Sequence, residues 1–292
     1  MTIKRVGVVG SGIMGSGIAE VVAASGFEVV LRSRSASGAD AALSSMNRSL
    51  TRQVEKGKLL ASDRDSTLAR VIPVTDVAEL ADCDLVIESV TEELAVKQAL
   101  FAELDRVVGE HAILVTNTSS LAVVEIAMQT QHPERVCGIH FFNPAPVMPL
   151  VEIVRAITTS DATIAAATDF ATACGRSSVV VRDEAGFIVN RLLFPYLNNA
   201  VKLLESGIAS RDDIDSAMKG ACSFPLGPLE LLDLVGLDTS LSIIDVLHTE
   251  FSDANYSAAP LIRRMVAAQM LGRKTGQGFY EYPRKSSAPQ PS

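Results

Sequence analysis

A histidine and a glutamate occupy positions from which they could transfer a proton. His140 ends an apolar run and is followed by a turn rich in proline, while Glu152 lies within a second apolar run at residues 150–154. If the chain reverses about Pro146, the two side chains lie opposite each other. A carboxylate that orients an imidazole and stabilises its protonated form makes a general base for an alcohol proton. The same spacing also suits a strand-end histidine with local partners and a surface glutamate, so the pair is a hypothesis.

Three further polar side chains stand where a ligand could meet them. Ser119 follows the apolar run at residues 112–115, and Asn143 precedes Pro144 in the turn. Each has an ordinary structural explanation, as a helix N-cap and as a turn former. Asn190 differs because it interrupts an apolar helical stretch, where a buried amide requires a partner. We therefore expect Asn190 to point towards a cleft or a ligand.

The N-terminal segment has the pattern of a dinucleotide site. An apolar run at residues 6–9 passes directly into Gly-x-Gly-x-x-Gly, a helical segment follows, and a second apolar strand covers residues 28–31. The motif consists of Gly10, Gly12, Ile13, Met14 and Gly15, with Ser11 between the first two glycines. Such a turn lets backbone N–H groups and a helix N-terminus close on a pyrophosphate. Without its strand and helix the pattern would indicate only a tight turn; with them it favours a nucleotide site.

The end of the second strand bears on which nicotinamide cofactor binds. In an NAD site an acidic residue usually holds the ribose 2′-hydroxyl there, roughly 20 residues after the glycines. This chain instead has Arg32, Ser33 and Arg34. Arginine and serine can hydrogen-bond a 2′-phosphate, whereas a carboxylate would repel it. The sequence therefore favours NADP over NAD, and the alternative is a solvated basic turn.

The order of the elements predicts the fold. Strand and helix patterns alternate through the first part of the chain, which is typical of an α/β fold with a Rossmann-type doubly wound parallel sheet. We expect this dinucleotide-binding domain at residues 1–184, a smaller all-helical domain at 185–284 and a disordered tail at 285–292. Ligands of such sheets bind beyond the carboxyl ends of the strands, where Ser119 and His140 stand.

Composition argues against several classes of partner. The 292-residue chain has a net charge of −8 and no basic block, so we expect neither nucleic acid nor an anionic membrane as a partner. It has no signal-like N-terminus and no apolar run long enough to span a bilayer. Its 4 cysteines are scattered, without a Cys-x-x-Cys pair. We therefore predict reduced thiols, no metal site and a cytoplasmic location.

Several long motifs resemble a known family. The chain is similar to the L-3-hydroxyacyl-CoA dehydrogenase family, including the bacterial 3-hydroxybutyryl-CoA dehydrogenases, from about residue 4 to residue 282. The similarity is carried by GSGIMGSGIA at 10–19, NTSS at 117–120, HFFNP at 140–144, DEAGFIVNR at 183–191, PLGP at 225–228 and RKTGQGFY at 273–280. Many family members have an acidic pair where this chain has Arg32 and Ser33, which puts NAD use in doubt and agrees with the argument for NADP.

The resemblance also implies roles for individual residues. It implies His140 as catalytic base with Glu152 as its partner, Ser119 and Asn190 near the reacting carbon, and Asn143 beside substrate and nicotinamide. It implies cofactor contacts at Glu92, Lys97, Asn117, Ser119 and Lys274, and coenzyme A contacts at Ser49 and Lys56. A lysine at such a position suits the anionic phosphates of the coenzyme. The family precedent is a homodimer formed through the helical domain.

The function implied by the resemblance is reversible hydride transfer. The hydride would pass between a nicotinamide cofactor and C3 of a short L-3-hydroxyacyl-CoA, with His140 taking or returning the proton. One alternative keeps this chemistry but acts on a carrier-protein-bound hydroxyacyl group or on a sugar acid. A second alternative is a nucleotide-binding protein without catalytic activity.

Overall fold

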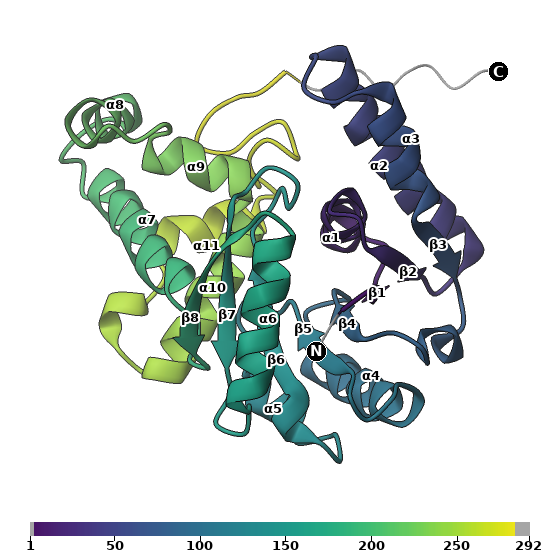
Figure 1. Ribbon diagram of the computed structural model, residues 1–292. Coiled ribbons are helices and arrows are strands. Elements are labelled where there is room, and N and C mark those ends of the chain that lie inside the picture. Colours follow the sequence, from purple (N-terminus) through teal and green to yellow (C-terminus); the bar gives the residue numbers. More distant parts are fainter. Residues whose placement is uncertain (1–2, 284–292) are drawn as a thin grey trace. The chain divides into compact units, whose positions relative to one another are not determined.

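The structure, a computed structural model, describes residues 3–283 (Figure 1). These residues form two compact units, which divide between Phe187 and Ile188. The predicted disordered tail at residues 285–292 lies outside the described residues. Within residues 3–283, no helix has both the length and the apolar character needed to cross a membrane.

A sheet of eight strands forms the centre of the first unit. Its strands are β1 (Arg5–Val9), β2 (Glu28–Arg32), β3 (Val71–Val74), β4 (Leu85–Glu88), β5 (Ile113–Thr116), β6 (Val136–Phe141), β7 (Leu150–Arg155) and β8 (Ser177–Arg182). Their order is β3-β2-β1-β4-β5-β6-β7-β8. Neighbouring strands are parallel except for β6 and β7, which are antiparallel. The order reverses between β1 and β4, the place where doubly wound sheets bind ligands. The predicted fold class is confirmed.

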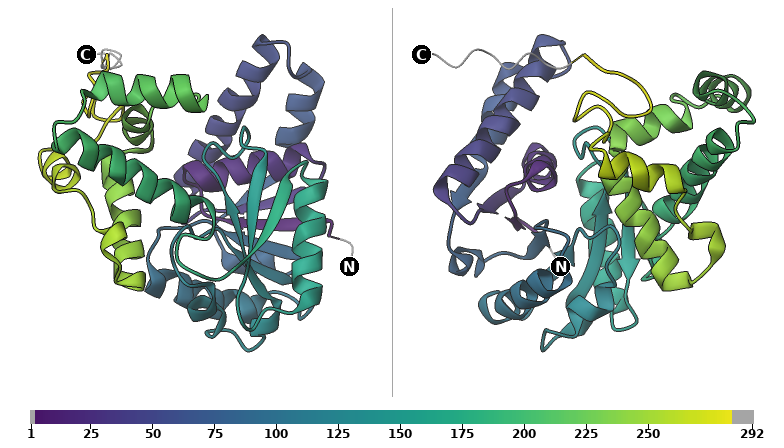
Figure 2. Two further views of the ribbon diagram at one scale, coloured as in Figure 1. Left: turned by 90° about the vertical axis from the view of Figure 1, so that its left-hand side faces the viewer. Right: turned by 180° about the vertical axis from the view of Figure 1, so that it is seen from behind.

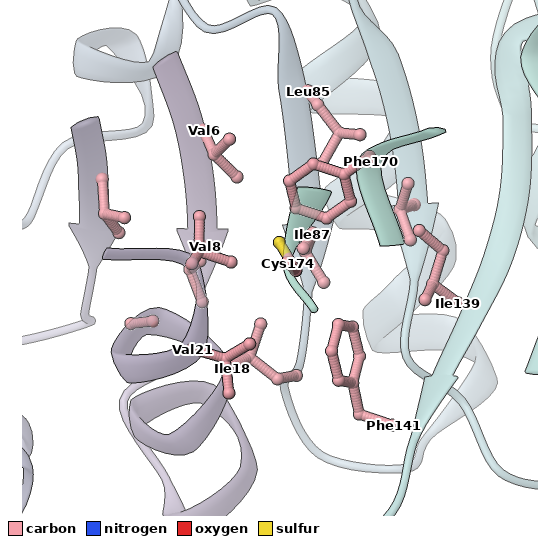
Figure 3. Close-up of a cluster of buried hydrophobic side chains, with 14 of the residues drawn as sticks. Val6, Val8, Ile18, Val21, Leu85, Ile87, Ile139, Phe141, Phe170 and Cys174 are labelled. Atoms are coloured by element: carbon pink, nitrogen blue, oxygen red, sulfur yellow. The ribbon is translucent and has the colours of Figure 1, made fainter. Parts of the chain in front are cut away.

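Helices cover both faces of this sheet. They are α1 (Ile13–Ala24), α2 (Ala36–Glu55), α3 (Ala61–Ala69), α4 (Leu94–Val107), α5 (Val123–Ala127) and α6 (Asp161–Ala173), with short 3₁₀ helices at Val77–Leu80 and Pro133–Arg135. On one face, Val6 and Val8 of β1 pack with Ile18 of α1 and Phe170 of α6 (Figure 3). The other face is covered in part by α4, whose Phe101 is fully buried. Each large apolar side chain buried in this way contributes roughly 1.5–3 kcal/mol to stability.

The helix α2 brings a polar surface next to α1. Ser35 caps the N-terminus of α2, because its side-chain oxygen accepts a hydrogen bond from the N–H of Gly38. The buried residues of α2 follow helical spacing from Ala39 to Leu50. That apolar stripe packs towards α1, while α2 and α3 lie side by side as a helical hairpin (Figure 2). The hairpin therefore presents the polar residues near the end of α2 beside the first helix of the nucleotide fold.

Among its described residues, up to residue 283, the second unit has helices as its only regular elements. They are α7 (Val189–Glu205), α8 (Arg211–Cys222), α9 (Pro228–Val235), α10 (Leu237–Phe251), a 3₁₀ helix at Ala254–Tyr256 and α11 (Pro260–Ala267). A buried carboxylate joins two of them, because Asp215 of α8 accepts from the N–H groups of Leu229 and Glu230 at the start of α9. The expected helical second domain is confirmed.

Candidate active site

The strands β6 and β7 bring the predicted proton-transfer pair together. Their antiparallel register places His140 directly opposite Glu152, and His140 Nδ1 lies 2.8 Å from Glu152 Oε2. Glu152 is fully buried and His140 is 4% exposed. Because a carboxylate faces Nδ1, the neutral imidazole carries its proton on Nδ1. Nε2 is then the ring nitrogen that can accept a proton.

Ser119 meets the other side of the imidazole. Its Oγ lies 3.1 Å from His140 Nε2, so a hydroxyl group occupies the position opposite Glu152. Two phenylalanine rings pack against the imidazole, Phe142 with a centroid separation of 4.5 Å and Phe187 with one of 5.5 Å. The N-cap of α5 is Ala122, so the alternative interpretation of Ser119 as that helix cap is wrong. The three polar groups form a line, carboxylate to imidazole to hydroxyl.

The turn between β1 and α1 has the backbone of a phosphate-binding site. Gly10 has φ +121°, and a Cβ there would collide with the carbonyl oxygen of Ser89. A Cβ at Gly15 would collide with the carbonyl oxygen of Gly10, whereas one at Gly12 would meet no heavy atom of the described residues within 4 Å. Gly12 is also the N-cap of α1. The backbone at Gly12 is therefore open to close approach at the N-terminus of α1, where helix N–H groups favour a pyrophosphate, and this turn fits a dinucleotide.

The basic segment after β2 divides into a buried and an exposed part. Ser33 is 3% exposed, and its Oγ lies 2.8 Å from Ser11 Oγ in the glycine turn. Arg32 is half-buried and donates from Nε to the carbonyl oxygen of Thr75 at 3.2 Å. Arg34 is exposed. Ser33 thus links β2 to the turn, and the contact of Arg32 and Arg34 with the adenosine ribose stays a prediction.

A buried ion pair lies beyond the carboxyl end of β4. Lys97 of α4 is 1% exposed, and its Nζ lies 2.7 Å from Glu88 Oε1. Glu88 is fully buried and also accepts from Thr116 Oγ1 at 2.7 Å. Sequence reasoning missed Glu88, although one signal was present: a carboxylate that directly ends an apolar strand. The contact of Lys97 with a cofactor stays a prediction.

Glu92 connects this ion pair to the loop that carries Ser119. Its Oε2 lies 3.1 Å from Lys97 Nζ, and its Oε1 accepts from the N–H of Ser119 at 2.8 Å. Thr118 Oγ1 donates to the same oxygen. Burial opposes ionisation of Glu92, but Lys97 and these hydrogen bonds outweigh it and lower the pKa of the carboxyl group. Glu92 is therefore an anion that holds the backbone beneath Ser119.

The two predicted asparagines of the first unit have different surroundings. Asn117 Oδ1 accepts from the N–H of Phe141 at 2.8 Å, so this side chain joins the ends of β5 and β6. Asn143 lines a pocket, and its peptide bond to Pro144 is cis. Asn117 supports the strand end that carries His140, whereas Asn143 has a surface open to a ligand.

The pocket that Asn143 lines has a volume of about 530 Å³, and its other lining residues come from α1, from α2 and the residues just after it, and from the rest of residues 143–147. Both residues predicted to contact coenzyme A, Ser49 and Lys56, line it. Arg52, which the sequence analysis did not select, lines it as well, and so does Lys58, the neighbouring alternative to Lys56 for the coenzyme A contact. The pocket therefore combines a polar helix face with positive charge, as an anionic ligand requires.

Two predicted site residues belong to the second unit. Asn190 lies in the first turn of α7 and is 7% exposed. Lys274 is half-exposed, and its Nζ contacts Asp238 Oδ1 at 2.5 Å. Their placement beside the reacting groups stays a prediction.

Comparison with known proteins gives matches along the whole described chain. The model of the 3-hydroxyacyl-CoA dehydrogenase NAD binding domain matches residues 5–184, and that of the 3-hydroxyacyl-CoA dehydrogenase C-terminal domain matches residues 186–282. The chain is 47% identical to a 3-hydroxybutyryl-CoA dehydrogenase of Mycobacterium tuberculosis, over 96% of this chain and 99% of that protein. It is 43% identical to the human mitochondrial hydroxyacyl-coenzyme A dehydrogenase, over 96% and 91%. A crystal structure of (S)-3-hydroxybutyryl-CoA dehydrogenase from Ralstonia eutropha superposes with a TM-score of 0.94, at 43% identity and over 97% and 100% of the two chains.

Proposed function

The chain belongs to the 3-hydroxyacyl-CoA dehydrogenase family, and on this premise we propose that His140 and Glu152 form the acid–base pair of its hydride transfer. The protein is an oxidoreductase that uses a nicotinamide cofactor, NAD or NADP. The reacting carbon in the proposal is C3 of a short-chain L-3-hydroxyacyl-CoA, such as 3-hydroxybutyryl-CoA. One observation carries it: a fully buried carboxylate lies 2.8 Å from an imidazole whose second nitrogen meets a hydroxyl group.

In this proposal the proton moves between the substrate oxygen and His140 Nε2. When bound, the nicotinamide supplies the acceptor or donor of the hydride. In oxidation, His140 Nε2 takes the proton of the substrate hydroxyl, and the C3–H bond breaks as the carbonyl forms. In reduction, the protonated imidazole returns that proton to the oxygen on C3. Glu152 offsets the positive charge of the imidazolium, and Ser119 and Asn190 hold the substrate oxygen where negative charge develops.

The pocket beside α2 supports a coenzyme A thioester as substrate. Ser49 offers a hydroxyl group, and Lys56 with Arg52 and Lys58 offers positive charge to phosphates. Hydroxyacyl groups on a carrier protein and sugar acids such as gulonate are the competing substrates. A protein without turnover on any of them would be a nucleotide-binding protein only.

Cofactor choice forms a second part of the proposal. Arg32 and Arg34 follow β2, and the chain has no carboxylate among residues 32–35, so we propose a preference for NADP. The test is kcat/KM for NADPH and for NADH with acetoacetyl-CoA. A higher value for NADPH is expected, and a clear preference for NADH contradicts this part without affecting the acid–base pair.

Initial-rate kinetics test the substrate. Oxidation of the reduced cofactor is followed by absorbance with acetoacetyl-CoA, longer 3-oxoacyl-CoA thioesters and an acetoacetyl carrier-protein thioester, and its formation is followed with gulonate. We expect the highest kcat/KM for a short acyl-CoA. Faster turnover of the carrier thioester or of gulonate would reassign the substrate, and no turnover of any would refute the catalytic proposal.

We also propose a cytoplasmic homodimer formed through the helical domain. Several large apolar side chains of the second unit are exposed in the single chain, among them Leu192 at 70%, Leu234 at 49% and Phe224 at 43%. Apolar surface of this kind often marks a subunit interface. Light scattering after size exclusion is expected to give twice the 31.0 kDa chain mass, and a monomer mass would contradict the dimer.

A further inference from the structure

One nearly buried carboxyl group has no part in the mechanism above. Glu20 lies on α1 and is 3% exposed. Its Oε1 accepts from Ser49 Oγ at 2.9 Å and from Gln53 Nε2 at 3.3 Å, both on α2. All three residues line the pocket beside α2. An acidic group in the wall of a pocket proposed to bind an anion requires a physical explanation.

Glu20 determines the direction of the hydrogen bonds that Ser49 can make. A serine hydroxyl has one proton to donate and two lone pairs that accept. Ser49 gives its proton to Glu20 Oε1, which also accepts from Gln53. Only the lone pairs of Ser49 are then left for a ligand. A ligand group bound at Ser49 must be a donor, such as the N–H of a secondary amide, because a carbonyl oxygen there would face another lone pair.

We propose that Glu20 is a positioning residue for substrate binding, which orients Ser49 to accept a hydrogen bond from an amide N–H on the arm of the substrate. The inference rests on the proposed function, since the pantetheine arm of a coenzyme A thioester carries two secondary amides. It goes further by assigning a role to Glu20 and a direction to the hydrogen bond. A sugar acid has no such amide and gains nothing from this arrangement.

The protonation state of Glu20 follows from its burial. Burial raises the pKa of Glu20 to about 7, and the hydrogen bond from Ser49 offsets only part of that effect. The other charged groups that line the same pocket are Arg52 of α2 and Lys56 and Lys58, which follow that helix; neither α3 nor residues 143–147 add a charged group to the described lining. A ligand that displaces water and brings phosphates to these cations makes a Glu20 carboxylate still less favourable.

The protonated form of Glu20 is therefore the form that binds acyl-CoA. Below the pKa of the free protein, the dissociation constant Kd does not depend on this group. Above it, each binding event requires proton uptake, so Kd rises with pH until the pKa of the complex is passed. Ser49 donates to Glu20 in both forms, so the direction of its hydrogen bond is unchanged.

Calorimetric titration with acetyl-CoA tests the proposal, because this thioester lacks the reacting 3-oxo group. Wild type is compared with Glu20→Gln, which keeps an acceptor oxygen but cannot ionise, and with Glu20→Leu, which has no acceptor. We expect the ratio of the wild-type Kd to the Glu20→Gln Kd to rise roughly fivefold to tenfold from about pH 6 to about pH 8. Glu20→Leu is expected to bind about tenfold more weakly than Glu20→Gln at both pH values.

Two controls separate this role from other effects. Glu55→Gln removes the same charge from an exposed position of α2 outside the pocket, and we expect its pH dependence to match wild type. Circular dichroism and NADH affinity report whether each variant is folded. A purely structural role of Glu20 would change these two measurements and would not produce a ratio that depends on pH.

The outcomes distinguish the two proposals. A Glu20→Leu protein that binds as tightly as Glu20→Gln overturns the positioning role of Glu20, and a ratio that stays constant with pH overturns the binding of acyl-CoA by its protonated form. Turnover of acetoacetyl-CoA by wild type is measured in parallel. Its absence contradicts the proposed function, whereas normal turnover with a constant ratio contradicts only the inference about Glu20.

Discussion

Replacement of Glu152 by glutamine removes one negative charge from the acid–base pair and changes little else. Glutamine has nearly the same shape, and its carbonyl oxygen can still accept from His140 Nδ1. The partner of the imidazole then becomes neutral. In the oxidation direction, the imidazolium that forms as the proton arrives loses the charge that stabilises it.

The expected magnitude follows from the geometry. Nδ1 of His140 and Oε2 of Glu152 are 2.8 Å apart, and both side chains are buried. With each charge spread over its group, the centres are about 4 Å apart, and opposite charges at that distance attract by about 4 kcal/mol at an effective dielectric constant of 20. Since the hydrogen bond is retained, we expect a loss of roughly 3–4 kcal/mol of transition-state stabilisation, or about 10²–10³-fold in kcat.

The assay is kcat for oxidation of 3-hydroxybutyryl-CoA, the direction in which the imidazolium forms, together with Kd for NADH. A matched control exists in the chain, because His132 Nδ1 lies 3.5 Å from Glu134 Oε1 and both side chains are largely exposed. Glu134→Gln is expected to keep wild-type kcat, since exposed ion pairs contribute little. If Glu152→Gln lowered kcat no more than Glu134→Gln does, the electrostatic argument would be refuted.

Three further predictions concern the cofactor turn, the buried ion pair and the substrate oxygen. Gly12→Ala is expected to fold normally but to weaken NADH binding by about tenfold or more in a fluorescence titration; unchanged affinity would mean that the pyrophosphate lies elsewhere. Lys97→Met leaves the buried Glu88 carboxylate without its cation, so the free energy of unfolding in urea should fall by about 3–5 kcal/mol, and a loss below about 1 kcal/mol would contradict the burial argument. Ser119→Ala removes the hydroxyl partner of His140 Nε2 and should lower kcat roughly 10–10²-fold at saturating substrate; an effect on KM alone would assign Ser119 to binding.

The β6–β7 pairing could be predicted from the sequence. Two apolar runs flank a turn with three prolines, and an antiparallel register that buries both runs places His140 opposite Glu152. The glycine turn was predictable for a similar reason, because its function depends on backbone shape and glycine is the residue that permits it. In both cases local sequence determines the geometry.

The buried ionic groups could not be predicted in the same way. Lys97 and Glu88 are separated by residues that belong to a loop and a helix, and an isolated lysine on a helix normally faces water. Only the placement of α4 against the ends of β4 and β5 encloses them. Ser33 was predicted, with Arg32 and Arg34, to hydrogen-bond a 2′-phosphate, and its contact with Ser11 was not predicted because it depends on how β2 lies beside β1.

Glu20 and the strand β8 were missed for two different reasons. Glu20 looks like a polar position on an amphipathic helix, and its burial arises because α2, which begins twelve residues after α1 ends, covers it. β8 spans Ser177–Arg182 at the edge of the sheet, and its polar ends and partly exposed valines give no clear alternation. The burial of Glu20 and the formation of β8 both depend on contacts between residues that are distant in the sequence.

The central claim is that the imidazole of His140 transfers the proton while the hydride moves. Stopped-flow mixing of the reduced cofactor and acetoacetyl-CoA with His140→Asn tests it, because asparagine can still bond to Glu152 but offers no basic nitrogen to the substrate. We expect hydride transfer roughly 10²–10⁴-fold slower than in wild type, with cofactor affinity unchanged. Hydride transfer at close to the wild-type rate in this variant would contradict it.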